Sequence, residues 1–283
     1  PVRWQDGAAQ PGELKAGFAL TSLPLARLSA LTAFPLNGHL SARGRLQGPL
    51  KDVNSTVALD LVRPGAGPLQ LPERWQGQLT GTSGSAFDLR LASQAPAIAG
   101  SLTARLGASG WPLQADLRRG GGRLTVRSDA RPQLRWKADQ LSIAGLQLTL
   151  PTTSSSGSLQ GRLSGEGALA LTPLELVGDL HLDDPKLRGI GLNRIELDGR
   201  VSAGRFQTRV RLQPQQGEIQ LTAQGRLGGN LRSRIEASGV DVPWLVQMAR
   251  QLRDGQPAVA GITGRAEDLG TLMIETFGGS LDG

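Results

Sequence analysis

Apolar and polar residues alternate most regularly in three neighbouring stretches: Ile195-Glu-Leu-Asp-Gly-Arg-Val201, Phe206-Gln-Thr-Arg-Val-Arg-Leu212 and Ile219-Gln-Leu-Thr-Ala-Gln-Gly-Arg-Leu227. Residues two apart in a β-strand point to the same face, so each stretch is predicted to be a strand with one apolar and one polar face. Turn-forming residues separate the stretches, at 202–204 and 213–217. Connections this short predict antiparallel neighbours, and hence a meander.

The same alternation extends through most of the chain. It predicts further strands over residues 36–48, 53–61, 87–91, 98–106, 111–117, 124–126, 146–150, 159–171, 174–182 and 231–237. Two stretches, residues 22–31 and 241–248, instead place apolar residues at helical spacing behind a Pro. We expect both to be short amphipathic helices in an otherwise all-β chain.

One motif occurs twice. Residues 38–46 and 161–169 both match G-x-L-S-x-x-G-x-L, with a separation of 123 residues. The recurrence favours an internal repeat. We therefore expect one repeat module over residues 1–133, a second over 134–240, and the truncated start of a third over 241–283.

Composition excludes several classes of protein. The 283 residues contain no Cys, which excludes disulfide scaffolds, thiolate zinc sites and Cys nucleophiles. The excess of 31 Lys and Arg over 24 Asp and Glu is mild, aromatic residues make up only 4%, and there is no Tyr, so a nucleic-acid partner is not expected. The longest apolar stretch, residues 23–34, contains Arg27 and cannot form a membrane-spanning helix. Because the chain begins without Met and stops within a predicted strand, we expect a segment of a longer protein.

A long sheet with one Leu-rich face must cover that face, because an open patch of this size would drive association. The sheet could pack on itself as a sandwich, close as a barrel, or curl into a trough that leaves the apolar face to a ligand. Glycines on the apolar side of the strands, among them Gly44, Gly165 and Gly199, would let the sheet bend sharply and favour the trough. The side chains predicted to line it are Leu40, Leu46, Val57, Leu59, Leu163, Leu169, Leu180, Leu182, Ile195, Leu197, Val201, Phe206, Val210, Leu212, Ile219, Leu221 and Leu227.

Catalytic motifs are missing. The sequence has no Walker A motif, nucleophile elbow, H-E-x-x-H or EF-hand loop, so no catalytic residue, no metal site and no cofactor is predicted. His181, Asp183 and Asp184 form the one compact cluster of metal-ligand types, and the pattern fits better a polar strand face that leads into an Asp-Asp-Pro turn.

Arginines mark the polar side of one predicted strand. Arg205, Arg209 and Arg211 are expected to form a solvated outer face, with anionic lipid headgroups at a groove rim as the alternative.

The proline-headed helix at 22–31, the repeated G-x-L-S-x-x-G-x-L strand and the terminal Phe277-Gly-Gly-Ser-Leu281 resemble the repeat modules of TamB and AsmA-like envelope proteins, most closely the cyanobacterial type. The resemblance covers essentially the whole chain and is one of texture more than of invariant motifs. It implies an elongated, twisted antiparallel meander curled into a taco-like hydrophobic groove. It also implies a periplasmic segment of a protein anchored in the inner membrane by a helix outside this sequence.

Two functions follow from the resemblance. The first is conduction of phospholipids toward the outer membrane, with acyl chains in the groove. The alternative is a scaffold that assists the assembly of outer-membrane proteins with an Omp85-type, TamA-like barrel partner and pairs its strand edges with nascent strands. A third interpretation, a closed and self-packed sandwich, predicts a dry core. None of the three is an enzyme.

Overall fold

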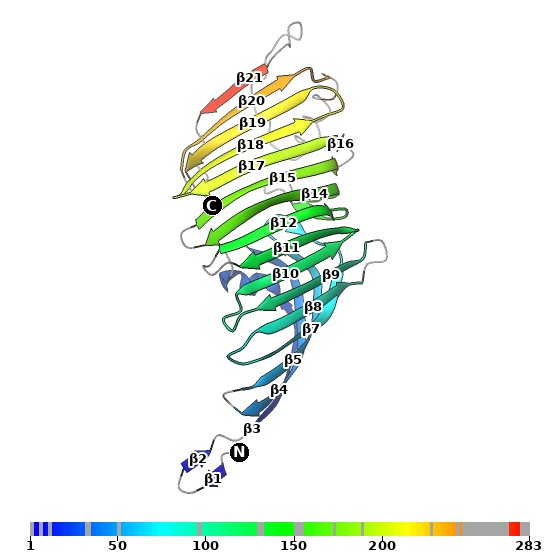
Figure 1. Ribbon diagram of the computed structural model, residues 1–283. Coiled ribbons are helices and arrows are strands. Elements are labelled where there is room, and N and C mark those ends of the chain that lie inside the picture. Colours follow the sequence, from blue (N-terminus) through cyan, green and yellow to red (C-terminus); the bar gives the residue numbers. More distant parts are fainter. Residues whose placement is uncertain are drawn as a thin grey trace. The chain divides into compact units, whose positions relative to one another are not determined.

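The computed structural model describes residues 3–5, 8–10, 13–31, 35–49, 52–94, 98–128, 133–149, 156–171, 174–187, 190–226, 229–241, 244 and 272–277. The described residues are almost entirely β-strand, and the strands pair antiparallel (Figure 1). The chain divides into two compact units, residues 1–128 and 129–283. All-β architecture, as the alternation predicts, is thus confirmed.

The first unit contains strands β1 to β11. Their bounds are β1 Arg3–Gln5, β2 Ala8–Gln10, β3 Glu13–Pro24, β4 Leu36–Pro49, β5 Asn54–Ala66, β6 Leu69–Gln70, β7 Arg74–Thr82, β8 Phe87–Ser93, β9 Gly100–Leu106, β10 Pro112–Arg119 and β11 Gly122–Ser128. One 3₁₀ segment, η1 Leu25–Leu31, follows β3. The main strands pair in sequence order from β3 to β11, except that β7 pairs with β5 beyond the two-residue β6.

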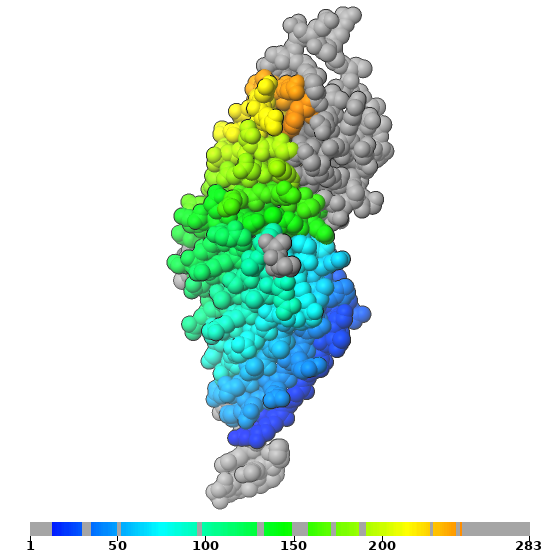
Figure 2. Space-filling view, turned by 90° about the vertical axis from the view of Figure 1, so that its right-hand side faces the viewer, coloured from blue at the N-terminus to red at the C-terminus, as the bar shows by residue number. Residues whose placement is uncertain are grey.

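The second unit contains β12 Gln133–Ser142, β13 Gln147–Thr149, β14 Ser156–Leu171, β15 Leu174–Leu187, β16 Ile190–Gly191, β17 Arg194–Ser202, β18 Arg205–Gln213, β19 Glu218–Arg226, β20 Leu231–Ser238 and β21 Leu272–Phe277. Neighbours in sequence again pair, with β12 against β14 and β15 against β17 across the short β13 and β16. Within each unit the surface is accordingly banded in sequence order (Figure 2).

The amphipathic helix expected at 22–31 is wrong in its bounds and type. Strand β3 continues through Pro24, and only Leu25–Leu31 is helical, as a 3₁₀ segment. In a 3₁₀ helix the side chains at i and i+3 are eclipsed, which puts Leu25 and Leu28 on one side. Leu25 is buried, and η1 packs against β4. The second expected helix, at 241–248, lies outside the described residues except for 241 and 244, and so does most of the expected module at 241–283.

The repeated motif marks a repeated set of β-bulges. In the first unit the register shifts between Leu20 and Leu23 on β3 and between Asn37 and His39 on β4. In the second it shifts between Ala138 and Leu141 on β12 and between Gln160 and Arg162 on β14. The motif's first glycine supplies the bulge, because Gly38 has φ of 100° and Gly161 has φ of 130°, which other residues rarely adopt.

The serine of the motif has the same role in both units. Ser41 Oγ accepts a hydrogen bond from the backbone N–H of Ser22 at 3.0 Å, and Ser164 Oγ accepts one from Gln140 at 3.0 Å. Both donors are bulge residues in the left-handed region, with φ of 50° and 47°. Each serine therefore fixes the bulge of the preceding strand.

An aromatic ring also recurs over the motif's second glycine. A Cβ on Gly44 would meet the Phe18 ring at 2.4 Å, and one on Gly167 would meet the Trp136 ring at 2.6 Å. On the following strand, Pro64 and Pro185 each accept a backbone hydrogen bond at 2.9 Å, from Leu71 and Leu192. The two units thus share one three-strand design, β3-β4-β5 in the first and β12-β14-β15 in the second.

Candidate functional site

The apolar side chains of the second unit line up in rows that run across the strands. One row follows the register through Leu141, Leu163, Leu182, Ile195, Leu212, Ile219 and Ala237. The next contains Ala138, Gly165, Leu180, Leu197, Val210, Leu221 and Ile235. Because directly opposed residues on one face have Cβ atoms about 5 Å apart, each row is a continuous apolar strip.

A third row consists of small residues that follow one Trp. It passes through Trp136, Gly167, Gly178, Gly199, Thr208, Ala223 and Ser233. Beyond it a fourth row is again apolar, with Leu134, Leu169, Leu176, Val201, Phe206, Gly225 and Leu231. The third row thus places small residues between two apolar rows, and the Trp136 ring lies over its first two glycines.

The predicted lining residues share the apolar face but are not packed as a core. Of the sixteen that the structure describes, only Val57 and Ile219 are buried, and the rest are partly exposed. Leu227 lies outside the described residues. No large side chain among those described is less than 2% exposed, and Leu174 and Leu176 are 44% and 38% exposed. A self-packed sandwich would bury such rows.

The apolar face of the first unit carries Leu40, Leu46, Val57 and Leu59, and this unit also holds a buried aromatic ring and a buried ion pair. Trp75 is buried against Gly100, where a Cβ would meet its ring at 2.6 Å. Beside it Arg119, whose register partners are Gly100 and Gly122, forms an ion pair with Glu73. The two side chains are 3% and 4% exposed. The alternation did not reveal this pair, because Arg119 occupies an apolar position of β10 and Glu73 precedes β7.

The polar faces hold cross-strand ion pairs. Arg74 Nε donates to Asp60 Oδ1 at 2.7 Å, and Arg123 Nε donates to Asp116 Oδ2 at 2.8 Å. These hydrogen bonds hold the pKa of each carboxyl below its ordinary value, although partial desolvation acts in the opposite direction. In the second unit Glu196 lies 3.3 Å from Arg194 and 3.4 Å from Arg211. These faces therefore carry networks of paired charges and are unsuited to apolar ligands.

The residues around His181 are engaged with their neighbours. His181 Nε2 lies 3.4 Å from Asp179 Oδ2, and Asp183 accepts from Gln140 Nε2 at 3.2 Å. No set of three His, Asp or Glu side chains in the described ranges is grouped as metal ligands would be. The turn expected at Asp183-Asp184-Pro185 is wrong. Strand β15 continues to Leu187, and Asp184, with φ of 49°, instead forms a bulge opposite Gly161.

Comparison with known proteins gives no relative. No family model, no curated protein and no solved structure matches the chain. Among the residues with a described conformation, no helix has the length and apolar character needed to cross a bilayer.

Proposed function

We propose that this chain is a periplasmic segment of an inner-membrane-anchored protein that conducts phospholipids along a hydrophobic, taco-like groove toward the outer membrane. The observation that carries the proposal is the set of apolar rows in the second unit. They are continuous from β14 to β20, and all their large side chains except Ile219 are at least partly exposed. Such a surface is suited to an acyl chain rather than to a substrate with polar groups.

The direction of the rows gives the mechanism. An acyl chain that lies along them passes from strand to strand over Leu180, Leu197, Val210 and Leu221 without crossing a polar side chain. Each step exchanges one apolar environment for another. Movement therefore avoids the cost of about 0.8 kcal/mol for each CH₂ that would enter water.

The third row supports this interpretation of the face. Its small side chains lie between rows of bulkier ones, and we expect them to leave space for an acyl chain in the direction of the rows. The compliant Leu side chains beside it can repack around a chain of any length. We expect low specificity for the acyl chain as a result, and no part in the process for a cofactor.

Mass spectrometry of organic extracts of the purified chain, with native spectra before and after delipidation, tests the proposal. We expect co-purified phospholipid in stoichiometric amounts. Val210→Asp should abolish lipid retention and lipid transfer between vesicles, because it places a charge in the middle of an apolar row. Thr222→Asp, on the polar face opposite Arg209 and Arg234, is the matched control and should retain both.

Two outcomes would overturn the proposal. A lipid-free, monodisperse chain would favour a closed sandwich, or a scaffold that crosslinks through its strand edges to an Omp85-type barrel. Unchanged lipid retention in folded Val210→Asp protein would show that lipid binds elsewhere.

A further inference from the structure

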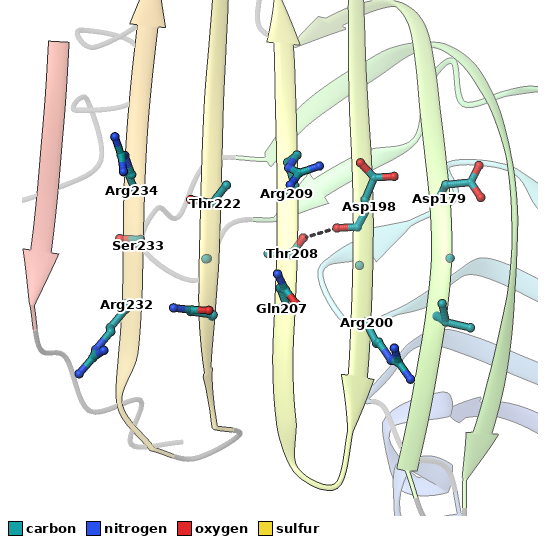
Figure 3. Close-up of a pocket in the computed structure, with 15 residues that line it drawn as sticks. Asp179, Asp198, Arg200, Gln207, Thr208, Arg209, Thr222, Arg232, Ser233 and Arg234 are labelled. Carbon is teal, nitrogen blue, oxygen red and sulfur yellow. Dashed lines mark hydrogen bonds between the residues drawn. The ribbon is translucent and has the colours of Figure 1, made fainter. Parts of the chain in front are cut away.

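The polar face of the second unit is hollowed between rows of arginines and amides. One row across β17, β18, β19 and β20 contains Arg200, Gln207, Gln224 and Arg232, in direct register. Figure 3 shows Arg200 and Arg232 at its two ends, with Gln207 between them. The neighbouring row, nearer the turns, contains Ser202, Arg205 and Arg226. With Phe206, Gly225 and Asn230, these residues line a hollow of about 670 Å³, which we call the arginine hollow.

The arginine hollow has positive charge without compensation. Four arginines line it and no acidic residue does. Within the described part of the chain, the salt bridges leave out Arg200, Arg205, Arg226 and Arg232, all of which are exposed. Arg200 and Arg232 also border the adjoining hollow, which contains Asp179 and Asp198 with Arg209 and Arg234, whereas Arg205 and Arg226 line the arginine hollow alone.

Two of these arginines also repel each other. Arg205 and Arg226 are direct register partners on β18 and β19. Like charges in this arrangement destabilise a sheet. Elsewhere on the same face Asp198 is opposite Arg209 and Glu196 is opposite Arg211, while Asp179 lies opposite the like-charged Asp198. Arg205 and Arg226 differ from these residues because no carboxylate lines their hollow. An external anion bound in the arginine hollow would therefore relieve this repulsion.

The spacing of the arginines indicates several anionic groups rather than one. Arg200 and Arg232 lie three strands apart, about 14 Å at the usual strand separation. A single phosphate cannot reach both. Phe206 is the one aromatic residue in the lining of the hollow, whereas single-stranded nucleic acids stack on a series of aromatic platforms. Guanidinium and amide groups are the donors that bind phosphate oxygens.

We propose that the arginine hollow binds clustered headgroups of anionic phospholipids and so docks this face on an anionic lipid surface. Arg205 and Arg226 would bind neighbouring phosphates, which removes their mutual repulsion, and Arg200 and Arg232 would bind those on either side. This face lies opposite the apolar rows, so the inference does not depend on the proposed conduction of acyl chains.

Flotation of the full chain with vesicles of phosphatidylglycerol and phosphatidylcholine tests the proposal. We expect binding that depends on phosphatidylglycerol and weakens as salt rises. The double variant Arg205→Gln/Arg226→Gln should bind about 30-fold more weakly, from a contribution of about 1 kcal/mol for each arginine near the surface. It should also melt at a slightly higher temperature without lipid, because the like-charge pair is gone.

The matched control is Arg43→Gln/Arg45→Gln, which removes two exposed arginines from the polar face of β4. It should bind within about twofold of the unaltered chain if the site is local rather than a matter of net charge.

Three results would overturn the inference. Equal loss in both double variants would show unspecific attraction. If Arg205→Gln/Arg226→Gln lost the binding of inorganic phosphate but bound vesicles as the unaltered chain does, the hollow would be a site for a small free anion. A labelled single-stranded oligonucleotide that competes with vesicles and binds more tightly would show a nucleic-acid surface.

Discussion

At the scale of single residues, the first unit places an ion pair where the strand pattern calls for apolar side chains. Glu73 and Arg119 are almost fully buried, beside Trp75. A buried pair of this kind contributes little net stability, since desolvation offsets the attraction of the charges. Removal of one partner is different, because it leaves the other charge buried and uncompensated. The pair should therefore fix the arrangement of this part of the apolar face.

Arg119→Met is expected to lower the free energy of unfolding of the first unit by about 3–5 kcal/mol, because Glu73 would lose its buried partner. Glu73→Leu/Arg119→Met should regain much of the loss. Urea unfolding followed by Trp fluorescence measures both. A double variant no more stable than Arg119→Met would contradict this account of the pair.

At the scale of strands, the glycines on the apolar face of the second unit differ in whether they would tolerate a side chain. Gly165 on β14 has φ of 146°, and a Cβ there would lie 2.1 Å from the Asp179 carbonyl oxygen of β15. Gly199 on β17 is equally central but has open space, since its nearest neighbour would be the Leu197 side chain at 3.7 Å. The two positions form a matched pair for substitution.

Gly165→Ala should cost about 1–3 kcal/mol of stability, since it combines backbone strain with a backbone clash. Gly199→Ala should be near neutral, because a strand residue with ordinary φ gains from the loss of glycine's flexibility. Chemical denaturation of the two variants, with their circular dichroism compared at room temperature, checks this. Equal destabilisation by both would show that the third row tolerates no added methyl group.

The strands that the alternation predicted and those it missed differ in a physical way. The regular stretches from Ile195 to Ala237 have no bulge and were correctly predicted to be antiparallel strands. Strands β3 and β12 were missed because a bulge in each shifts the two-residue period. Strand β7 was missed because Gly77 and Gly81 occupy its apolar positions. The G-x-L-S-x-x-G-x-L motif located the repeat, but the part of its serine in a hydrogen bond between strands depends on pairing that sequence spacing does not specify.

The candidate site was predictable to a similar degree. The alternation of apolar and polar residues was enough to assign the lining residues to the apolar side of their strands. It could not show that Leu180, Leu197, Val210 and Leu221 form one row, because that depends on the register between strands. The aromatic side chains Trp75 and Trp136, each seated over glycine, were not singled out, since a ring over a glycine is a contact between strands. The arginine hollow likewise results from the register of four strands.

At the scale of the whole molecule, stability should depend on pH through the carboxylates of the first unit. The pKa of Asp60 and that of Asp116 are lowered in the folded chain from an ordinary value of 3.8, by hydrogen bonds from Arg74 and Arg123. A group with a lowered pKa contributes stability above its unfolded pKa and loses it as pH falls through the folded value.

We expect the urea midpoint to be steady from neutral pH to about pH 5 and to fall below about pH 4. Asp60→Asn/Asp116→Asn should be less stable at neutral pH and should show a shallower fall in acid. Asp52→Asn/Asp88→Asn removes two carboxylates that form no ion pair within the described part of the chain, and should keep the full slope. If the urea midpoint of Asp60→Asn/Asp116→Asn fell in acid as steeply as that of the unaltered chain, the two ion pairs would not be the source of the pH dependence.

The pairing of almost every strand with its neighbour in sequence has a consequence for biogenesis. Low contact order lets a sheet grow one strand at a time as the polypeptide is delivered from its N-terminus, without waiting for distant partners. Each newly added strand is briefly an open edge that accepts only the next segment to arrive. A chain built this way is suited to vectorial folding, in which structure forms in the order of synthesis and the apolar rows lengthen with every hairpin.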